Sequence, residues 1–180
     1  NAAPQTTDEF DSAPIGLQWQ WEANVNLSWY SLAVRPGWLR LFSQRPSPKY
    51  KNLWNVPSLM LQKLPAPAFS ATVKLDCSSL SVSERTGLVV FGLDYSSIGV
   101  RRTERELVIE QALCPKADKG TSEETVASDG IMNPDVFLRE EKHPENQKDI
   151  IPKVLCDFSY STDGKTFHRL GKTFTAREGI

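Results

Sequence analysis

The sequence predicts an all-β protein, an antiparallel β-sandwich of jelly-roll type. Hydrophobic residues alternate with a period of two in several segments, and no segment shows the capped, amphipathic pattern of a helix. Clusters of Pro, Gly, Ser and Asp separate these segments, which is typical of sandwiches built from short strands. A chain of 180 residues, 39% of them hydrophobic, can bury a core without disulfides or metals. We expect residues 1–180 to form one sandwich domain, with a linker-like segment at residues 1–7.

The first expected strand lies within residues 16–21. Leu17, Trp19 and Trp21 would share one face of this strand, and Gln18 and Gln20 would share the other. The short hydrophobic stretch VPSLMLQKL at residues 56–64 contains a proline near its start. It therefore allows either a strand or a single helical turn.

Three later segments have clearer strand patterns. Residues 69–76 alternate apolar with polar side chains, as a half-buried strand does. Residues 87–93, GLVVFGL, are apolar on both faces and predict a central strand covered on both sides. Residues 154–160 alternate into Asp163-Gly164, which predicts a hairpin turn that returns the chain through Phe167.

Two polar, charged segments interrupt this pattern. They span residues 116–129, KADKGTSEETVASD, and residues 140–148, EEKHPENQK. We expect both to be exposed loops or the tips of strands.

The charge balance excludes several classes of partner. The chain carries 22 acidic and 21 basic residues, a net charge of -1, so it lacks the basic surface that nucleic acid requires. No apolar run approaches the roughly 18 residues of a membrane span. No cationic start followed by an apolar stretch marks a signal peptide in this chain. We therefore expect neither nucleic acid nor membrane as a partner.

The sequence predicts no catalytic residues. The motifs GxSxG, HExxH, GxGxxG and the P-loop are absent. The two histidines, His143 and His168, are best interpreted as surface residues. The three widely spaced cysteines predict neither a disulfide framework nor a metal knuckle. Cys156 lies in phase with the apolar residues of its segment and is expected to be a small buried side chain.

We expect no required cofactor, and one metal hypothesis stays open. Asp8, Asp11 and Asp157 could supply the oxygen ligands that a structural calcium prefers. The alternative is that these acids are ordinary solvated surface residues.

Aromatic residues are concentrated in the first third of the chain. Flat aromatic rings can stack on the apolar faces of sugars while amides and carboxylates bind the sugar hydroxyls. Trp19 and Trp21 share a face with Leu17, so they suit core or domain-interface packing as well as glycan contact. Trp54 is the better candidate for an exposed platform. The candidate carbohydrate-binding residues are Trp54, Trp19, Trp21, Tyr50 and Gln20.

A set of short motifs in a fixed order supports a family assignment. They are Asp8-Glu9-Phe10, GLQWQW at 16–21, RPGWLRL at 35–41, GLVVF at 87–91, IGV at 98–100, VFLR at 136–139 and FSYSTDGKTF at 158–167. Together they resemble the C-terminal concanavalin A-like β-sandwich of glycoside hydrolase family 43 enzymes, the β-xylosidases and α-L-arabinofuranosidases. The form NLWNVP at 52–57 followed by LMLQK at 59–63 looks most like Bacteroides relatives.

The resemblance implies a non-catalytic accessory domain. In that family an N-terminal five-bladed β-propeller carries the catalytic acids, so none is carried over to this chain. The sandwich packs on the propeller and in some members sends a loop to the rim of the active site. The resemblance also implies plant xylan or arabinoxylan as the substrate class and a periplasmic or extracellular bacterial location. Family members continue past the hairpin with further strands, whereas this chain ends at Ile180.

Two other functions stay open from the sequence. The chain could be an independent carbohydrate-binding module that binds a plant cell-wall oligosaccharide on its own surface. It could also be an independent hydrolase with a carboxylate pair of its own, whose two acids would flank a cleft.

Overall fold

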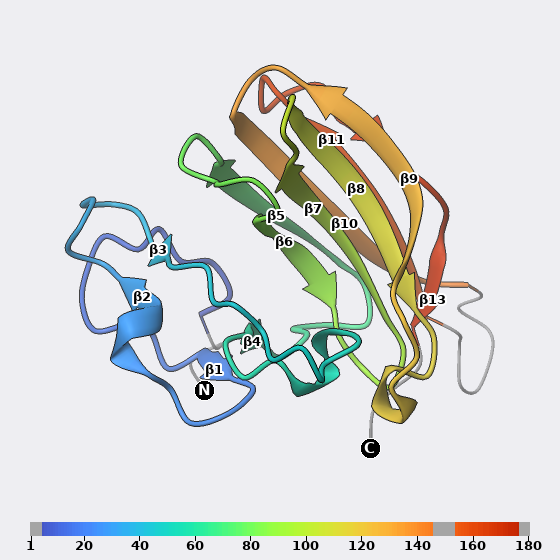
Figure 1. Cartoon of the computed structure of the whole chain (residues 1–180), viewed down its shortest axis with the longest axis horizontal. Helices are drawn as coiled ribbons and strands as arrows, with labels where there is room; N and C mark the ends of the chain where they lie inside the picture. Colours follow the sequence, from blue (N-terminus) through green and yellow to red (C-terminus); the bar gives the residue numbers. More distant parts are fainter. Residues whose placement is uncertain (1–4, 146–153, 177–180) are drawn as a thin grey trace. The chain divides into compact units, whose positions relative to one another are not determined.

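The computed structural model describes residues 5–145 and 154–176 (Figure 1). The chain divides into two compact units, residues 1–65 and residues 66–180, and each is described by itself. The expectation of one sandwich domain over residues 1–180 stays a prediction. The same holds for the linker at residues 1–7, of which residues 1–4 lie outside the described residues.

The first unit consists mainly of loops held by two short antiparallel pairs. Proline and polar residues interrupt its hydrophobic stretches, so its strands stay short. Asn26 and Asn52 begin its two 3-10 turns, because each side chain accepts a hydrogen bond from the backbone two residues on. The strand pairs are β1 (Trp19–Trp21) with β4 (Met60–Gln62) and β2 (Tyr30–Ser31) with β3 (Arg40–Leu41), and the turns are η1 (Leu27–Trp29) and η2 (Leu53–Asn55).

The second unit contains two antiparallel sheets. One has the order β6-β7-β8-β9, with strands β6 (Arg85–Val90), β7 (Tyr95–Arg102), β8 (Leu107–Cys114) and β9 (Glu124–Ile131). The other has the order β12-β11-β10-β5, and β13 also pairs with β11. Its strands are β5 (Phe69–Asp76), β10 (Asp135–Pro144), β11 (Val154–Ser161), β12 (His168–Arg169) and β13 (Phe174–Ala176); η3 (Ala117–Lys119) is the short turn before β9.

Residues from both sheets form one hydrophobic core. Ile98 and Ile109 of the first sheet belong to the same cluster as Leu138 and Phe158 of the second, and all four are almost completely buried. Cys156 is buried in this cluster as predicted, and burial raises the pKa of its thiol to about 12. The all-β, antiparallel fold class is therefore confirmed.

The strands with clear alternation were predicted correctly. Strand β5 spans residues 69–76, and β11 begins at Val154 and pairs with β12 through the expected hairpin. The hairpin loop covers residues 162–167. It includes Gly164 with φ near 71°, and Asp163 Oδ1 accepts hydrogen bonds from the backbone of Lys165 and Thr166, each at 2.8 Å. In residues 56–64 the strand alternative holds at β4.

Other segment predictions were wrong. Strand β6 is an edge strand ending at Val90 rather than a central strand over residues 87–93, because its only partner among the described residues is β7. Leu17 lies outside β1 and is fully exposed, so it does not share a buried face with Trp19.

The two polar segments agree with the prediction only in part. Residues 116–123 form turns and loops before β9, as expected. Residues 124–129 belong to β9, because an edge strand with mostly exposed side chains needs no apolar alternation. Strand β10 continues through Pro144, and Glu140 within it is buried. Residues 146–148 lie outside the described residues. No helix in the described part of the chain is long and apolar enough to cross a membrane.

Candidate functional site

One side chain, Asp8, organises the aromatic start of the first unit. Its Oδ2 accepts hydrogen bonds from Trp19 Nε1 at 2.8 Å and from Gln18 Nε2 at 3.0 Å. Its Oδ1 accepts the Phe10 backbone N–H at 2.9 Å. Phe10 has φ near 54°, a conformation uncommon for a bulky residue, and its ring stacks on Trp19 at 5.8 Å. Asp8 thus holds the Phe10 backbone directly, and it also holds the Trp19 ring on which Phe10 stacks.

A second aromatic cluster surrounds Trp21, which lies on β1 together with Trp19. The Trp21 ring lies 5.5 Å from the ring of Trp29 and 5.5 Å from that of Tyr30. Strand β1 pairs with β4 so that Trp19 is opposite Gln62 and Trp21 is opposite Met60. Both tryptophans are half-buried.

Beside these clusters the first unit forms a hollow of about 300 Å³. Two segments line it, residues 10–15 and residues 30–37, and they bring Phe10 and Tyr30 to the same cavity. The polar side chains in the lining include Asp11, Ser12 and Tyr30, and the rest is mainly apolar. A smaller hollow of about 210 Å³ shares part of the 10–15 segment. A mainly apolar lining with a few polar groups is the usual composition of a small-ligand site.

The predicted carbohydrate-binding residues lie elsewhere in the first unit. None of them lines either hollow. Trp54 is half-buried in η2, whereas Tyr50 and Gln20 are exposed. Their role in glycan contact stays a prediction. The sequence did not indicate that Asp11 and Tyr30 line the same hollow, because only the fold brings their two segments together.

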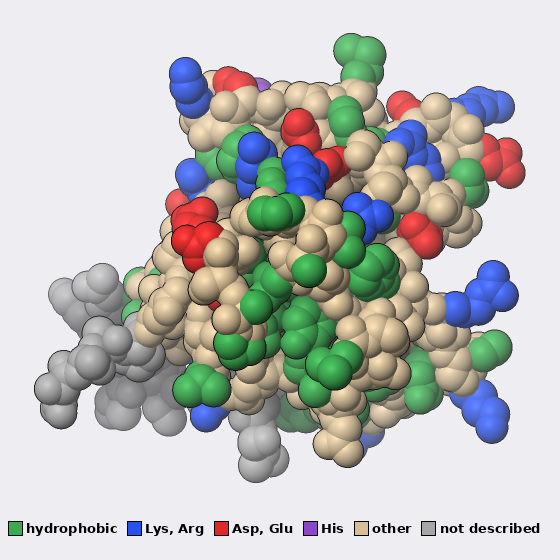
Figure 2. Space-filling view, turned by 90° about the vertical axis from the view of Figure 1, so that its left-hand side faces the viewer, with side chains coloured by type: hydrophobic (Ala, Val, Ile, Leu, Met, Phe, Trp, Pro, Cys, Tyr) green, Lys and Arg blue, Asp and Glu red, His purple; other side chains and the backbone are tan. Residues whose placement is uncertain are grey.

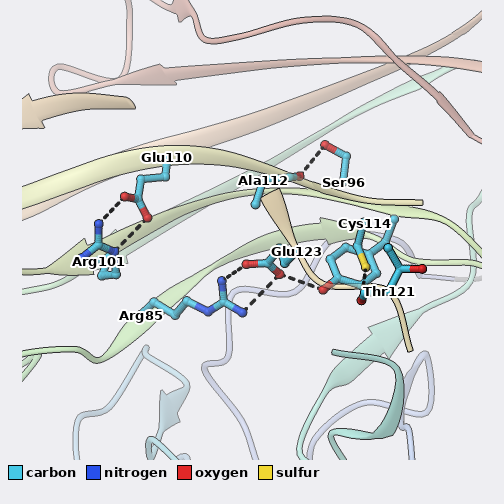
Figure 3. A network of polar contacts seen from close by, with 9 residues as sticks. Arg85, Ser96, Arg101, Glu110, Ala112, Cys114, Thr121 and Glu123 are labelled. Carbon is cyan, nitrogen blue, oxygen red and sulfur yellow. Dashed lines mark hydrogen bonds and ion pairs between the residues drawn. The ribbon is translucent and has the colours of Figure 1, made fainter. Parts of the chain in front are cut away.

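In the second unit, two carboxylates are held by arginines (Figure 3). Glu110 binds Arg101 through two hydrogen bonds, one of them from Nε at 2.9 Å, and these contacts raise the pKa of Arg101. Glu123 binds Arg85 and also accepts the Tyr95 hydroxyl at 2.7 Å. Both glutamate side chains are only 16% exposed.

Glu140 and Asp157 of the second unit have shifted pKa values. Burial raises the pKa of Glu140, whose side chain lies on the buried face of β10 and whose Oε1 has no hydrogen-bond partner among the described residues. Burial alone would raise the pKa of Asp157, but hydrogen bonds from Thr173 and His143 and the Arg169 charge lower it. Glu140 has the shift expected of a general acid, yet it is 6% exposed and belongs to the sandwich interior.

The two histidines sit in different surroundings. His168 is exposed on β12, as predicted. His143 is half-buried, and its Nε2 lies 3.1 Å from Asp157 Oδ2. The predicted surface position of His143 is therefore only partly correct, because the neighbouring strand supplies a carboxylate partner.

The described residues contain no group of three or more His, Cys, Asp or Glu side chains that could hold a metal. Asp8 binds its three nitrogen partners, and Asp157 binds Arg169, Thr173 and His143. A structural calcium at Asp8, Asp11 and Asp157 stays a prediction.

The two antiparallel sheets around a common core define a β-sandwich module of concanavalin A-like type. A family model described as the beta xylosidase C-terminal concanavalin A-like domain matches residues 7–178. The chain belongs to this family.

Individual relatives agree with this assignment. The chain is 28% identical to a beta-xylosidase of Formosa agariphila over 195 residues, which covers 98% of this chain and 30% of the relative. A bifunctional GH43-CE structure of Bacteroides eggerthii superposes with a TM-score of 0.80 at 22% identity, covering 93% of this chain and 20% of that one. An engineered GH43 glycoside hydrolase, described as displaying endo-xylanase and exo-arabinofuranosidase activity, has a TM-score of 0.80 at 22% identity. It matches 99% of this chain and 36% of its own.

Proposed function

We propose that this chain is a non-catalytic accessory domain of a family 43 glycoside hydrolase. It docks on the N-terminal catalytic propeller of its parent protein and helps to shape the cleft for xylan-type or arabinoxylan-type glycans. The parent is a β-xylosidase or α-L-arabinofuranosidase that acts in the periplasm or outside the cell. The family assignment and the names of the relatives support this proposal, and these relatives are several times longer than the matched segment.

The observation that carries the docking role is the distribution of hydrophobic side chains. All buried hydrophobic side chains of the described residues belong to the second unit. Eight of the ten large hydrophobic side chains that are exposed belong to the first unit. Figure 2 shows hydrophobic side chains gathered on one face of the molecule. The exposed set in the first unit is Leu17, Val25, Leu27, Val34, Leu41, Phe42, Tyr50 and Leu64.

This distribution is physically unfavourable for a free surface. Ordering a loop-rich segment costs conformational entropy, which burial of apolar surface normally offsets. A concentration of exposed apolar side chains in one part of a protein indicates an interaction surface. A catalytic domain within the same parent chain is the natural occupant, because interfaces between domains of one chain typically bury about 600–1,500 Å².

The test is association between this chain and the separately expressed catalytic domain of its parent. We would replace Leu27 or Val34 with aspartate and measure binding by size-exclusion chromatography and calorimetry. Val82→Asp and Met132→Asp are matched controls, because both residues are exposed hydrophobics of the second unit. We expect the first-unit variants to weaken association at least tenfold and the controls to leave it unchanged.

Two results would contradict the proposal. One is equal or greater loss of association in the second-unit variants. The other is hydrolysis of aryl xylosides or arabinosides by the 180-residue chain alone, since an accessory domain has no turnover of its own.

A further inference from the structure

We propose that the hollow between residues 10–15 and residues 30–37 binds one neutral sugar ring of a glycan. This site is separate from the candidate carbohydrate-binding residues of the sequence, because none of the five lines it: Trp54, Trp19, Trp21, Tyr50 and Gln20. The proposal does not depend on docking to a catalytic domain.

The walls of the hollow are fixed before any ligand arrives. Phe10 is held by the Asp8 carboxylate and by the stacked Trp19 ring, and Tyr30 is packed against Trp21. A bulky residue with positive φ is retained only where its surroundings determine its conformation. Such preorganised aromatic walls lower the cost of ordering a binding site.

Three polar groups of the lining are available to a ligand. The Asp11 carboxylate, the Ser12 hydroxyl and the Tyr30 hydroxyl have no hydrogen-bond partner among the described residues, and all three belong to the lining. Together they offer hydroxyl donors and a strong acceptor beside an apolar wall. A sugar ring needs this combination, because its C–H faces are apolar and its rim carries hydroxyls.

Charge and size narrow the ligand class. No lysine or arginine lines either hollow, and Asp8, Glu9 and Asp11 lie along the same segment. An anionic ligand would therefore meet negative charge without a compensating cation. The volume of about 300 Å³ is at the lower end of small-molecule sites, which run from about 300 to 1,000 Å³. A single neutral sugar ring meets the charge condition, because it has no charge, and the volume condition, because it is small.

The test is titration of the 180-residue chain with xylobiose and with arabinobiose, followed by ligand-observed NMR. Tyr30→Phe removes only the hydroxyl, and Asp11→Ala removes the carboxylate. Each lost hydrogen bond should weaken binding about 2- to 10-fold. Tyr160→Phe removes a hydroxyl from β11 of the second unit, outside both hollows, and this control should leave the dissociation constant unchanged. Trp54→Ala removes the platform expected from the sequence and tests whether binding occurs there instead.

Glucuronic acid tests the charge argument, and we expect it to bind more weakly than either neutral disaccharide. Unchanged thermal unfolding of each variant would show that the fold is intact. The proposal is overturned if no neutral sugar binds saturably, if Trp54→Ala rather than Tyr30→Phe reduces binding, or if binding requires calcium and is lost with a chelator. A negative result in the sugar titrations does not affect the docking proposal, because docking is measured by association with the catalytic domain.

Discussion

Gln111 connects the two sheets of the second unit, and its removal should be costly. It lies on β8 and is completely buried. Its Nε2 donates to the Lys172 carbonyl at 2.7 Å, and its Oε1 accepts the Lys172 N–H at 2.8 Å. Lys172 belongs to the segment between β12 and β13, which both pair with β11 of the other sheet. One amide side chain therefore holds the last part of the described chain against the opposite sheet.

The expected magnitude for Gln111→Ala follows from these contacts. Two backbone hydrogen bonds are lost at about 1 kcal/mol each. The incompletely filled space left by the truncated side chain adds about 1–2 kcal/mol. We therefore expect the free energy of unfolding to fall by about 3–4 kcal/mol.

Urea unfolding followed by far-ultraviolet circular dichroism is the suitable assay, because all five tryptophans lie in the first unit and would report on that unit. Gln20→Ala, an exposed glutamine, is the control and should change stability by less than about 0.5 kcal/mol. Hydrogen exchange of the Lys172 amide should accelerate in Gln111→Ala. A loss below about 1 kcal/mol with unchanged exchange at Lys172 would refute the proposed link between the sheets.

Three further predictions follow from single side chains. The pKa of Glu140 is raised in the folded state, so its contribution to stability is full below the unfolded pKa and disappears as pH rises through the folded pKa. Glu140→Gln should therefore stabilise the chain at pH 7 and have little effect at pH 4, and an equal effect at both values would contradict this. Gly87→Ala would place a Cβ 2.2 Å from the Ile98 carbonyl oxygen, so we expect a loss of about 1–3 kcal/mol in urea unfolding; Ser70→Ala, exposed on β5, should be neutral. Asp8→Ala removes the acceptor for Phe10, Gln18 and Trp19 and should weaken the near-ultraviolet dichroism of the first unit, whereas an unchanged spectrum would show that the stacking alone fixes Phe10.

The local patterns of the sequence were reliable where the two faces of a strand differ in burial. Strand β5 alternates half-buried with exposed side chains over most of its length, and Cys156 and Phe158 of β11 are buried while Asp157 between them is half-buried. The period-two alternation predicted both strands together with the hairpin after β11. The local patterns failed for β9, because an edge strand with mostly exposed side chains has no apolar alternation to detect. They also failed for β6, because an apolar run does not reveal how many neighbours a strand has.

The candidate site was predicted only in part. The sequence showed that aromatic residues are concentrated in the first third of the chain, and the structure pairs Phe10 with Trp19 and Trp21 with Tyr30 there. The sequence could not show that Asp11 and Tyr30 line one hollow, because they are far apart along the chain and the pairing of β2 with β3 sets the position of Tyr30.

The sequence by itself therefore determined the all-β class, the strands with one buried face and the family, because these depend on residue order within short segments. The tertiary structure alone decided which polar residues are buried, as with Gln111 and Glu140, and which loops enclose a hollow. Burial and cavity shape depend on contacts between residues distant in the chain. No local pattern records those contacts, and they form only when the strands pair and the sheets pack.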